Sequence, residues 1–129
     1  TMDNRYDFTL KNHPNCQMSI NDYPTLNLKQ TNDSLEKILL KFDMVIVAGS
    51  STSALDAYMA GLRVIVYLDP YDFNYSPVRG FVDVKFVTDF KEMKAAIESE
   101  GVVNEKIKSL DDFFWLDKDL QRWRHFLKN

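Results

Sequence analysis

This chain of 129 residues has a single cysteine, no basic net charge and no long apolar run. Its single cysteine, Cys16, cannot form a disulfide within the chain, so a reducing cytoplasmic setting fits best. No apolar run approaches the roughly 20 residues that span a bilayer, so we expect no transmembrane segment. The formal net charge of −3 lacks the basic footprint that nucleic-acid binding usually leaves. We therefore expect no nucleic acid among the partners.

Two glycine-rich phosphate motifs are also missing. No GxGxxG follows the first apolar run, and the sequence contains neither GKS nor GKT, which disfavours dinucleotide-binding and P-loop sites. The carboxylates of Asp69, Asp72 and Asp83 do not have the spacing of a calcium-binding loop. The sequence therefore predicts no metal site.

The chain does contain short apolar runs that alternate with amphipathic segments. The runs predict strands at 8–10, 25–28, 44–48, 64–68 and 84–87, and the segments between them predict helices at 32–41, 52–60 and 90–98. We expect Asn32 or Asp33 to cap the first helix, Asp89 to cap the third, and Gly61 to end the second. The continuous apolar run at 44–48 is typical of a strand that is buried on both faces.

Strands that alternate with helices at this interval indicate βαβ units with a parallel sheet. Right-handed crossovers would place helices on both faces. The predicted fold is therefore α/β, a Rossmann-like, doubly wound and mostly parallel sheet, as a single domain over residues 1–129. Because Thr1 stands ahead of Met2, we also expect this domain to be an excised piece of a larger protein.

A row of four hydroxyl residues follows the strand predicted at 44–48. In open α/β sheets, ligands bind outside the carboxyl ends of the strands, and a helix N-terminus there offers free N–H groups to an anion. The predicted phosphate-binding residues are Gly49, Ser50, Ser51, Thr52 and Ser53. Asp56, one turn into the helix, is placed to accept hydrogen bonds from a sugar hydroxyl. The alternative is that Ser51 is a plain N-cap, or that Ser53 and Asp56 form a capping box.

His13 follows the first predicted strand in the segment KNHP. If that strand is parallel to the others, His13 lies at the same edge of the sheet as the hydroxyl turn. Its imidazole could then donate a hydrogen bond to a phosphate oxygen, or a proton to a leaving group. The alternative is an ordinary surface histidine. The other histidine, His125, is predicted to be structural.

The segment 69–80 is long for a connection between a strand and the next element, which is typical of binding loops. Within it, Asn74, Tyr75 and Ser76 are candidates for contact with a sugar. The equally weighted alternative is a packing loop whose aromatic side chains, Tyr71, Phe73 and Tyr75, cover the core.

An aromatic tail ends the chain. It contains Phe113, Phe114, Trp115 and Trp123, and its last part is predicted to be helical. We interpret this tail as a segment that packs on its own sheet, with docking onto a partner domain as the alternative.

Taken together, KNHP at 11–14 and DMVIVAGSSTSALDAYMAGLRVIVYLDP at 43–70 resemble the C-terminal half of GT-B glycosyltransferases. The likeness is to bacterial enzymes of surface-carbohydrate, lipopolysaccharide and capsule biosynthesis, including sialyltransferase-like and Kdo-transferase-like members. It implies that His13 assists catalysis, that the turn Ser50–Ser53 holds the donor phosphate, and that Asp56 stands for the glutamate that binds ribose. Asn12 departs from the proline that the family often has, and Asp56 is one methylene shorter than glutamate.

The resemblance also implies the partners and the setting. The donor would be a nucleotide-sugar, CMP- or UDP-linked, with no separate cofactor, and the acceptor a carbohydrate or lipid-linked molecule. The acceptor site and catalytic base would lie on a missing N-terminal domain, so this chain alone is expected to be inactive. We expect the transferase to be cytoplasmic, with peripheral placement at the inner membrane. The alternatives are half of a nucleotide-sugar epimerase, or a non-catalytic module that assembles carbohydrate-biosynthesis proteins.

Overall fold

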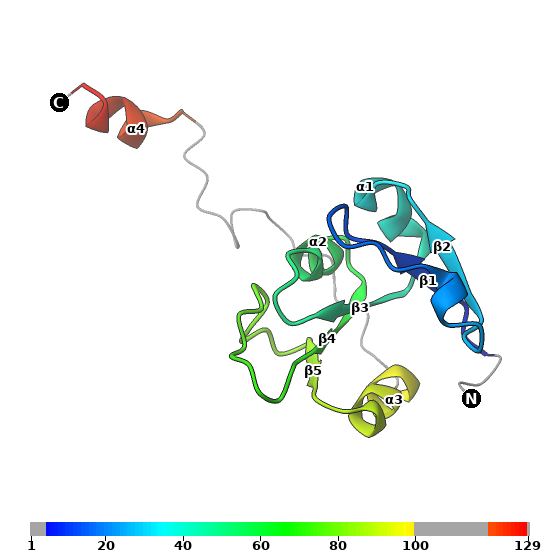
Figure 1. Cartoon of the computed structure of the whole chain (residues 1–129). Helices are drawn as coiled ribbons and strands as arrows, with labels where there is room; N and C mark the ends of the chain where they lie inside the picture. Colours follow the sequence, from blue (N-terminus) through cyan, green and yellow to red (C-terminus); the bar gives the residue numbers. More distant parts are fainter. Residues whose placement is uncertain (1–4, 100–118, 129) are drawn as a thin grey trace. The chain divides into compact units, whose positions relative to one another are not determined.

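A computed structural model of the chain describes residues 5–99 and 119–128. The chain divides into two compact units, Thr1–Phe42 and Asp43–Asn129. Short helices accompany small open sheets of parallel strands, so the chain has an α/β fold (Figure 1). Among the described helices, none has the length and apolar character needed to cross a membrane.

The first unit is built on two parallel strands. Strand β1 (Phe8–Lys11) pairs with β2 (Leu28–Thr31). A loop with a short 3₁₀ helix (Ile20–Asp22) joins them. After β2 come helix α1 (Leu35–Ile38) and a 3₁₀ turn (Leu39–Lys41). Within this helical segment the Ile38 and Leu39 side chains are buried.

Two boundaries in this unit differ from the sequence prediction. The strand expected at 25–28 begins only at Leu28, because a turn precedes it in which the Leu26 N–H donates to the Tyr23 carbonyl (2.9 Å). The helix is not capped by Asn32 or Asp33. Its N-cap position is Ser34, whose extended backbone (φ −63°, ψ 149°) precedes the first helical residue.

The second unit contains a sheet of three parallel strands in the order β3-β4-β5. These are β3 (Met44–Ala48), β4 (Arg63–Tyr67) and β5 (Lys85–Val87), each within one residue of its predicted bounds. Helix α2 (Ser53–Met59) connects β3 to β4, and α3 (Phe90–Glu98), as predicted, follows β5.

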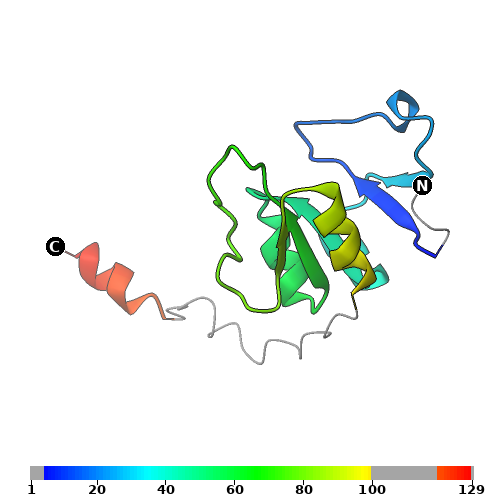
Figure 2. The same ribbon diagram turned by 90° about the horizontal axis from the view of Figure 1, so that it is seen from below.

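The core of this unit is centred on β4. Its Val64, Ile65 and Val66 side chains are only 2%, 1% and 0% exposed. Because successive side chains of a strand point to opposite faces, both faces of β4 must be covered. Helices α2 and α3 both contact β4 and lie on either side of it (Figure 2). The expectation that residues 44–48 are fully buried is wrong: they form an edge strand of this sheet, and their side chains are half-buried or, at Ala48, exposed.

Helix α3 is held at both ends by side chains. As predicted, Asp89 caps its N-terminus, where the carboxylate accepts the Glu92 N–H (2.8 Å). At its C-terminal end the Arg63 guanidinium donates to the Ala96 carbonyl (2.8 Å) and to the Ser99 hydroxyl (3.4 Å). A cation at this position satisfies carbonyls that lack a partner in the helix and opposes the negative end of its dipole.

Gly61 ends α2 in the left-handed conformation that the sequence predicts, with φ of 83°. The Gly61 N–H donates to the Tyr58 carbonyl (3.0 Å), and the Leu62 N–H donates to the Ala57 carbonyl (3.0 Å). These two bonds form a Schellman motif, which turns the chain from α2 into β4. Leu62 and Ala57 are both buried, as the apolar contact of that motif requires.

Gly61→Ala is expected to lower the free energy of unfolding by about 1–2 kcal/mol, because a Cβ is disfavoured in the left-handed region. Gly61→Asn is the matched comparison, since asparagine tolerates this region better. Urea denaturation followed by circular dichroism measures both. Equal losses for the two variants would show that backbone conformation is not the cause.

The last described element is helix α4 (Gln121–Phe126), which confirms that the end of the tail is helical. The Trp123 and Phe126 side chains on this helix are exposed. The predicted contributions of Phe113, Phe114 and Trp115 lie outside the described residues. The interpretation that the tail packs on its own sheet stays a prediction.

Candidate anion-binding site

The turn between β3 and α2 is the centre of the candidate site. It begins at Gly49, and the Ser51 N–H donates back to the carbonyl of Ala48 (3.0 Å). Helix α2 then starts at Ser53. The four hydroxyl residues therefore occupy the carboxyl end of β3, where the sequence placed them.

Ser51 is the residue that caps the helix. Its hydroxyl accepts the Ser53 N–H (3.3 Å), and its carbonyl accepts the Ala54 N–H (3.3 Å). Thr52 occupies the N-cap position, but its backbone is already helical (φ −68°, ψ −20°) and its hydroxyl makes no capping bond, so the capping bond comes from the Ser51 hydroxyl. The capping interpretation of this segment therefore holds for Ser51, and it accounts for only one of the four hydroxyls.

Several donors in the turn have no partner among the residues that the structure describes. Within the residues that the structure describes, the backbone N–H groups of Ser50 and Thr52 donate no hydrogen bond, and the hydroxyls of Ser50, Thr52 and Ser53 make none. The Ser50 and Thr52 side chains are exposed. Ser50 and Thr52, on either side of Ser51, thus present both amide and hydroxyl donors at the end of a strand, which is an arrangement suited to a phosphate oxygen.

Gly49 has a packing reason of its own. A Cβ on this residue would lie 2.9 Å from Cδ2 of Leu68 and 3.5 Å from the carbonyl oxygen of Tyr67. The absence of a side chain therefore lets β3 end close to the end of β4. The predicted role of Gly49 in ligand approach stays a prediction beside this structural role.

Asp56 lies on α2, one turn after the hydroxyl residues, and its side chain is exposed. Its carboxylate accepts no hydrogen bond from another described residue. It is therefore accessible to a ligand, and its contact with a sugar hydroxyl stays a prediction. Across residues 5–99 and 119–128, no three His, Cys, Asp or Glu side chains are grouped in a way that could hold a metal ion.

The long loop after β4 begins at the same edge of the sheet as this turn. The strands β3 and β4 are parallel, and Ala48 is paired with Tyr67 at their carboxyl ends. The loop is anchored by the buried side chains of Ser76 and Val78. Near its end Phe81 packs on Tyr58 of α2, with ring centroids 4.8 Å apart. The loop is thus fixed to the helix that carries the hydroxyl turn.

The two predicted sugar-binding residues, Asn74 and Ser76, shape this loop. The Asn74 side-chain oxygen accepts the Ser76 N–H (3.0 Å), and the Ser76 hydroxyl accepts the Val78 N–H (3.4 Å). The Arg79 guanidinium donates to the Asn74 carbonyl (3.3 Å). These bonds show a structural role for both residues, and their contact with a sugar stays a prediction.

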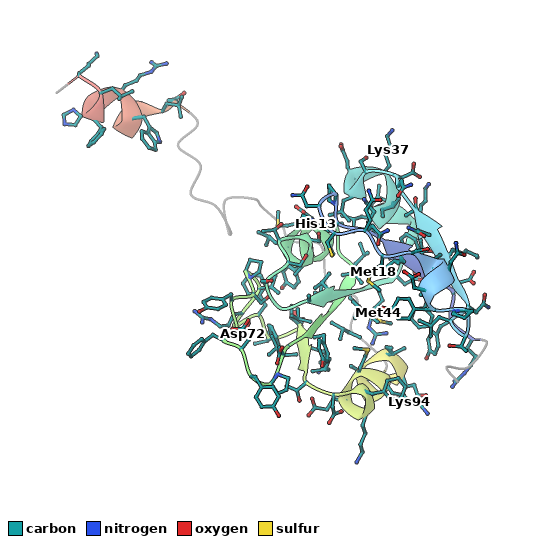
Figure 3. The ribbon with its side chains drawn as sticks, viewed as in Figure 1. His13, Met18, Lys37, Met44, Asp72 and Lys94 are labelled. Atoms are coloured by element: carbon teal, nitrogen blue, oxygen red, sulfur yellow. The ribbon has the colours of Figure 1, made fainter. Side chains whose placement is uncertain are left out.

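The aromatic residues of the loop do not cover the core, so that alternative is wrong. Tyr71, Phe73 and Tyr75 are 98%, 80% and 67% exposed. Burial at Ser76 and Val78 already anchors the loop, which leaves the rings outside. Asp72, between two of them, is labelled in Figure 3. Sequence analysis could not decide this point, because alternate aromatic residues fit a covering loop and an exposed one equally well.

Among the described residues, Tyr58 is the one whose side-chain pKa is clearly shifted by its surroundings. Burial raises its pKa above the ordinary value of 10.0, and the negative charge of Asp83 raises it further. Since the folded state favours the neutral phenol, this contribution to stability is complete below pH 10. It is lost as the pH rises from there through the raised pKa.

Asp83→Asn is therefore expected to lower the pKa of Tyr58 toward its ordinary value, because it removes the nearby negative charge. NMR titration of the Tyr58 ring carbons measures this pKa. Asp72→Asn, an exposed carboxylate in the same loop, is the control and should leave it unchanged. An unaltered pKa in Asp83→Asn would contradict the assignment of this charge effect.

His13 lies in the first unit, in a tight turn after β1. Its backbone pairs with that of Cys16, whose N–H donates to the His13 carbonyl (3.1 Å). The ring nitrogen Nδ1 accepts the backbone N–H of Asn15 (3.1 Å). The side chain is exposed. His13 and the hydroxyl turn belong to different units, so their association stays a prediction from the sequence.

Asn12 is a structural residue that the sequence analysis did not identify. Its side chain is 8% exposed and pairs with the backbone of Met18 in both directions. The amide nitrogen donates to the Met18 carbonyl (2.9 Å), and the amide oxygen accepts the Met18 N–H (3.2 Å). A proline, which the resemblance leads one to expect here, has no side-chain amide and could make neither bond.

Comparison of the whole chain with protein-family models, with curated proteins and with solved structures finds no match.

Proposed function

We propose that the chain is the donor-binding half of a GT-B glycosyltransferase, which transfers a sugar from a nucleotide-sugar to a surface polysaccharide or lipopolysaccharide acceptor. The observation that carries this proposal is the set of donors on Ser50 and Thr52, at the carboxyl end of a parallel strand, that have no partner among the described residues. The proposal includes the doubly wound, Rossmann-like arrangement of the intact half. It rests further on the sequence resemblance described above.

The proposed chemistry is the stabilisation of a leaving phosphate. As the bond between the sugar and the phosphate oxygen breaks, negative charge grows on that oxygen. Amide and hydroxyl donors that are already oriented toward it lower the energy of this state. Ser50 and Thr52 would supply them, while Ser51 keeps the turn in shape through its bond to Ser53. Asp56 would accept a hydroxyl of the ribose, and a base on another domain would deprotonate the acceptor.

One observation favours the non-catalytic assembly module as a second candidate. The exposed rings of Tyr71, Phe73 and Tyr75 lie on a single anchored loop, and soluble proteins seldom leave such apolar surface uncovered without a use. In a transferase these rings would face the sugar or base of the donor. In an assembly module they would face a protein.

Titration of the full chain with CMP, UDP and GDP, followed by amide NMR shifts, tests the proposal. Saturable shifts are expected at Ser50 and Thr52, whereas Lys94, on the exposed face of α3, should not move. The absence of shifts in the turn up to millimolar nucleotide would reject the donor-binding function. The assembly module would then be the better-supported candidate.

A further inference from the structure

The first part of the loop between β1 and β2, from Asn12 to Met18, is closed by a side chain, outside the backbone pair of His13 and Cys16. A primary amide offers one acceptor oxygen and a donor nitrogen, as a peptide group does. Asn12 uses both on Met18, so its side chain replaces a rung of a backbone ladder. Met18 and His13, which belong to this loop, are labelled in Figure 3.

The tip of the same loop fixes the imidazole of His13. A ring nitrogen that accepts a hydrogen bond carries no proton, and in a neutral imidazole the proton is then on the other nitrogen. Because Nδ1 accepts the Asn15 N–H, the proton of the neutral ring is on Nε2. The ring is exposed, so this Nε2–H is available to a ligand.

We propose that Asn12 is a positioning residue: by closing the loop on Met18 it keeps the Asn15 N–H aimed at Nδ1, and so holds His13 as a neutral Nε2–H donor for an anionic oxygen. A doubly protonated ring could not accept the Asn15 N–H. The position of the ring proton is independent of the proposed function, and only the identity of the anion, a donor phosphate, rests on it.

The test is side-chain ¹⁵N NMR of the full chain, at a pH well above the titration range of imidazole. The chain has two histidines, and His125 on α4 makes no side-chain hydrogen bond to a described residue, so it serves as the internal reference. His13 is expected to show the widely separated ¹⁵N signals of a single Nε2–H tautomer. If the unsubstituted chain showed averaged His13 signals like those of His125, or a proton on Nδ1, the proposal would be overturned without any variant.

Two variants then test the part played by Asn12. Asn12→Ala removes both bonds to Met18, and the His13 signals should collapse toward those of His125. Asn15→Ala keeps the backbone N–H and is the control that should leave the tautomer fixed. If Asn12→Ala does not fold, Asn12→Asp, which keeps the acceptor for the Met18 N–H, should show a partial collapse. An unchanged tautomer in a folded Asn12 variant would refute the positioning role.

Added CMP separates this inference from the proposed function. If the tautomer is fixed and the His13 Nε2 signal shifts with CMP, both proposals are supported. If the tautomer is fixed and CMP has no effect at His13 or at the hydroxyl turn, the glycosyltransferase proposal fails while the role of Asn12 stands.

Discussion

Ser50→Ala combined with Thr52→Val is expected to weaken nucleotide binding by a factor on the order of 100, with little change in stability. Each hydroxyl lost from a charged ligand costs about 1.5 kcal/mol or more, and 1.4 kcal/mol is a factor of ten in affinity. Neither hydroxyl has a partner within the described part of the protein, so folding does not depend on them. Isothermal titration calorimetry and urea denaturation measure the two effects.

Ser51→Ala is the matched variant in the same turn, and the opposite pattern is expected for it. Its hydroxyl caps α2, so its loss should cost about 1 kcal/mol of stability. The amide and hydroxyl donors of Ser50 and Thr52 remain, so nucleotide binding should fall much less. If the double variant bound nucleotide as tightly as the unaltered chain, the hydroxyl turn would not be the phosphate site.

Ile65→Ala is expected to give the largest loss of stability, about 2–5 kcal/mol. Ile65 lies in the middle of β4, the central strand of its sheet, and is 1% exposed. Its truncation would leave a cavity that neighbouring strands on both sides hinder from collapsing. A small domain has only about 5–15 kcal/mol in total, so much of the second unit would unfold in moderate urea.

Two substitutions calibrate this result. Ile65→Val removes one methylene and should cost about 0.5–1.5 kcal/mol. Val82→Ala alters a side chain that is 90% exposed, and its effect should stay within about 0.5 kcal/mol. Comparable losses for Val82→Ala and Ile65→Ala would contradict the assignment of the core to β4.

The elements of the second unit could be predicted because local signals determine them. The β-branched runs at 44–48 and 64–68 mark the strands, Asp89 marks the start of α3, and Gly61 marks the end of α2. In the first unit, β2 was misplaced because β-pairing with β1 depends on contacts distant in sequence. Residues 25–28 alternate as a strand does, but the turn at Tyr23 delays the strand until Leu28.

For the candidate site, the sequence predicted the location of the hydroxyl turn, and the binding roles given to its residues stay predictions. The position of the hydroxyl turn follows from the order of strand and helix. Which hydroxyl caps the helix depends on backbone angles: Thr52 is already helical, so the cap falls to Ser51. The role of Asn12 could not be predicted, because its partner Met18 lies in a loop whose path no periodic pattern reveals.

The contact of Arg63 with the last turn of α3 joins two elements that are far apart in the sequence. Arg63 is the first residue of β4, and the carbonyl it binds belongs to Ala96. The last turn of α3 can therefore open freely only when the hydrogen bond from the Arg63 guanidinium to the Ala96 carbonyl breaks. In native-state hydrogen exchange, Arg63→Met should accelerate the exchange of the Ser99 amide and leave the exchange of amides in the middle of β4 unchanged. This result would show that the C-terminal end of α3 opens independently of the sheet and that the Arg63 side chain restrains this opening.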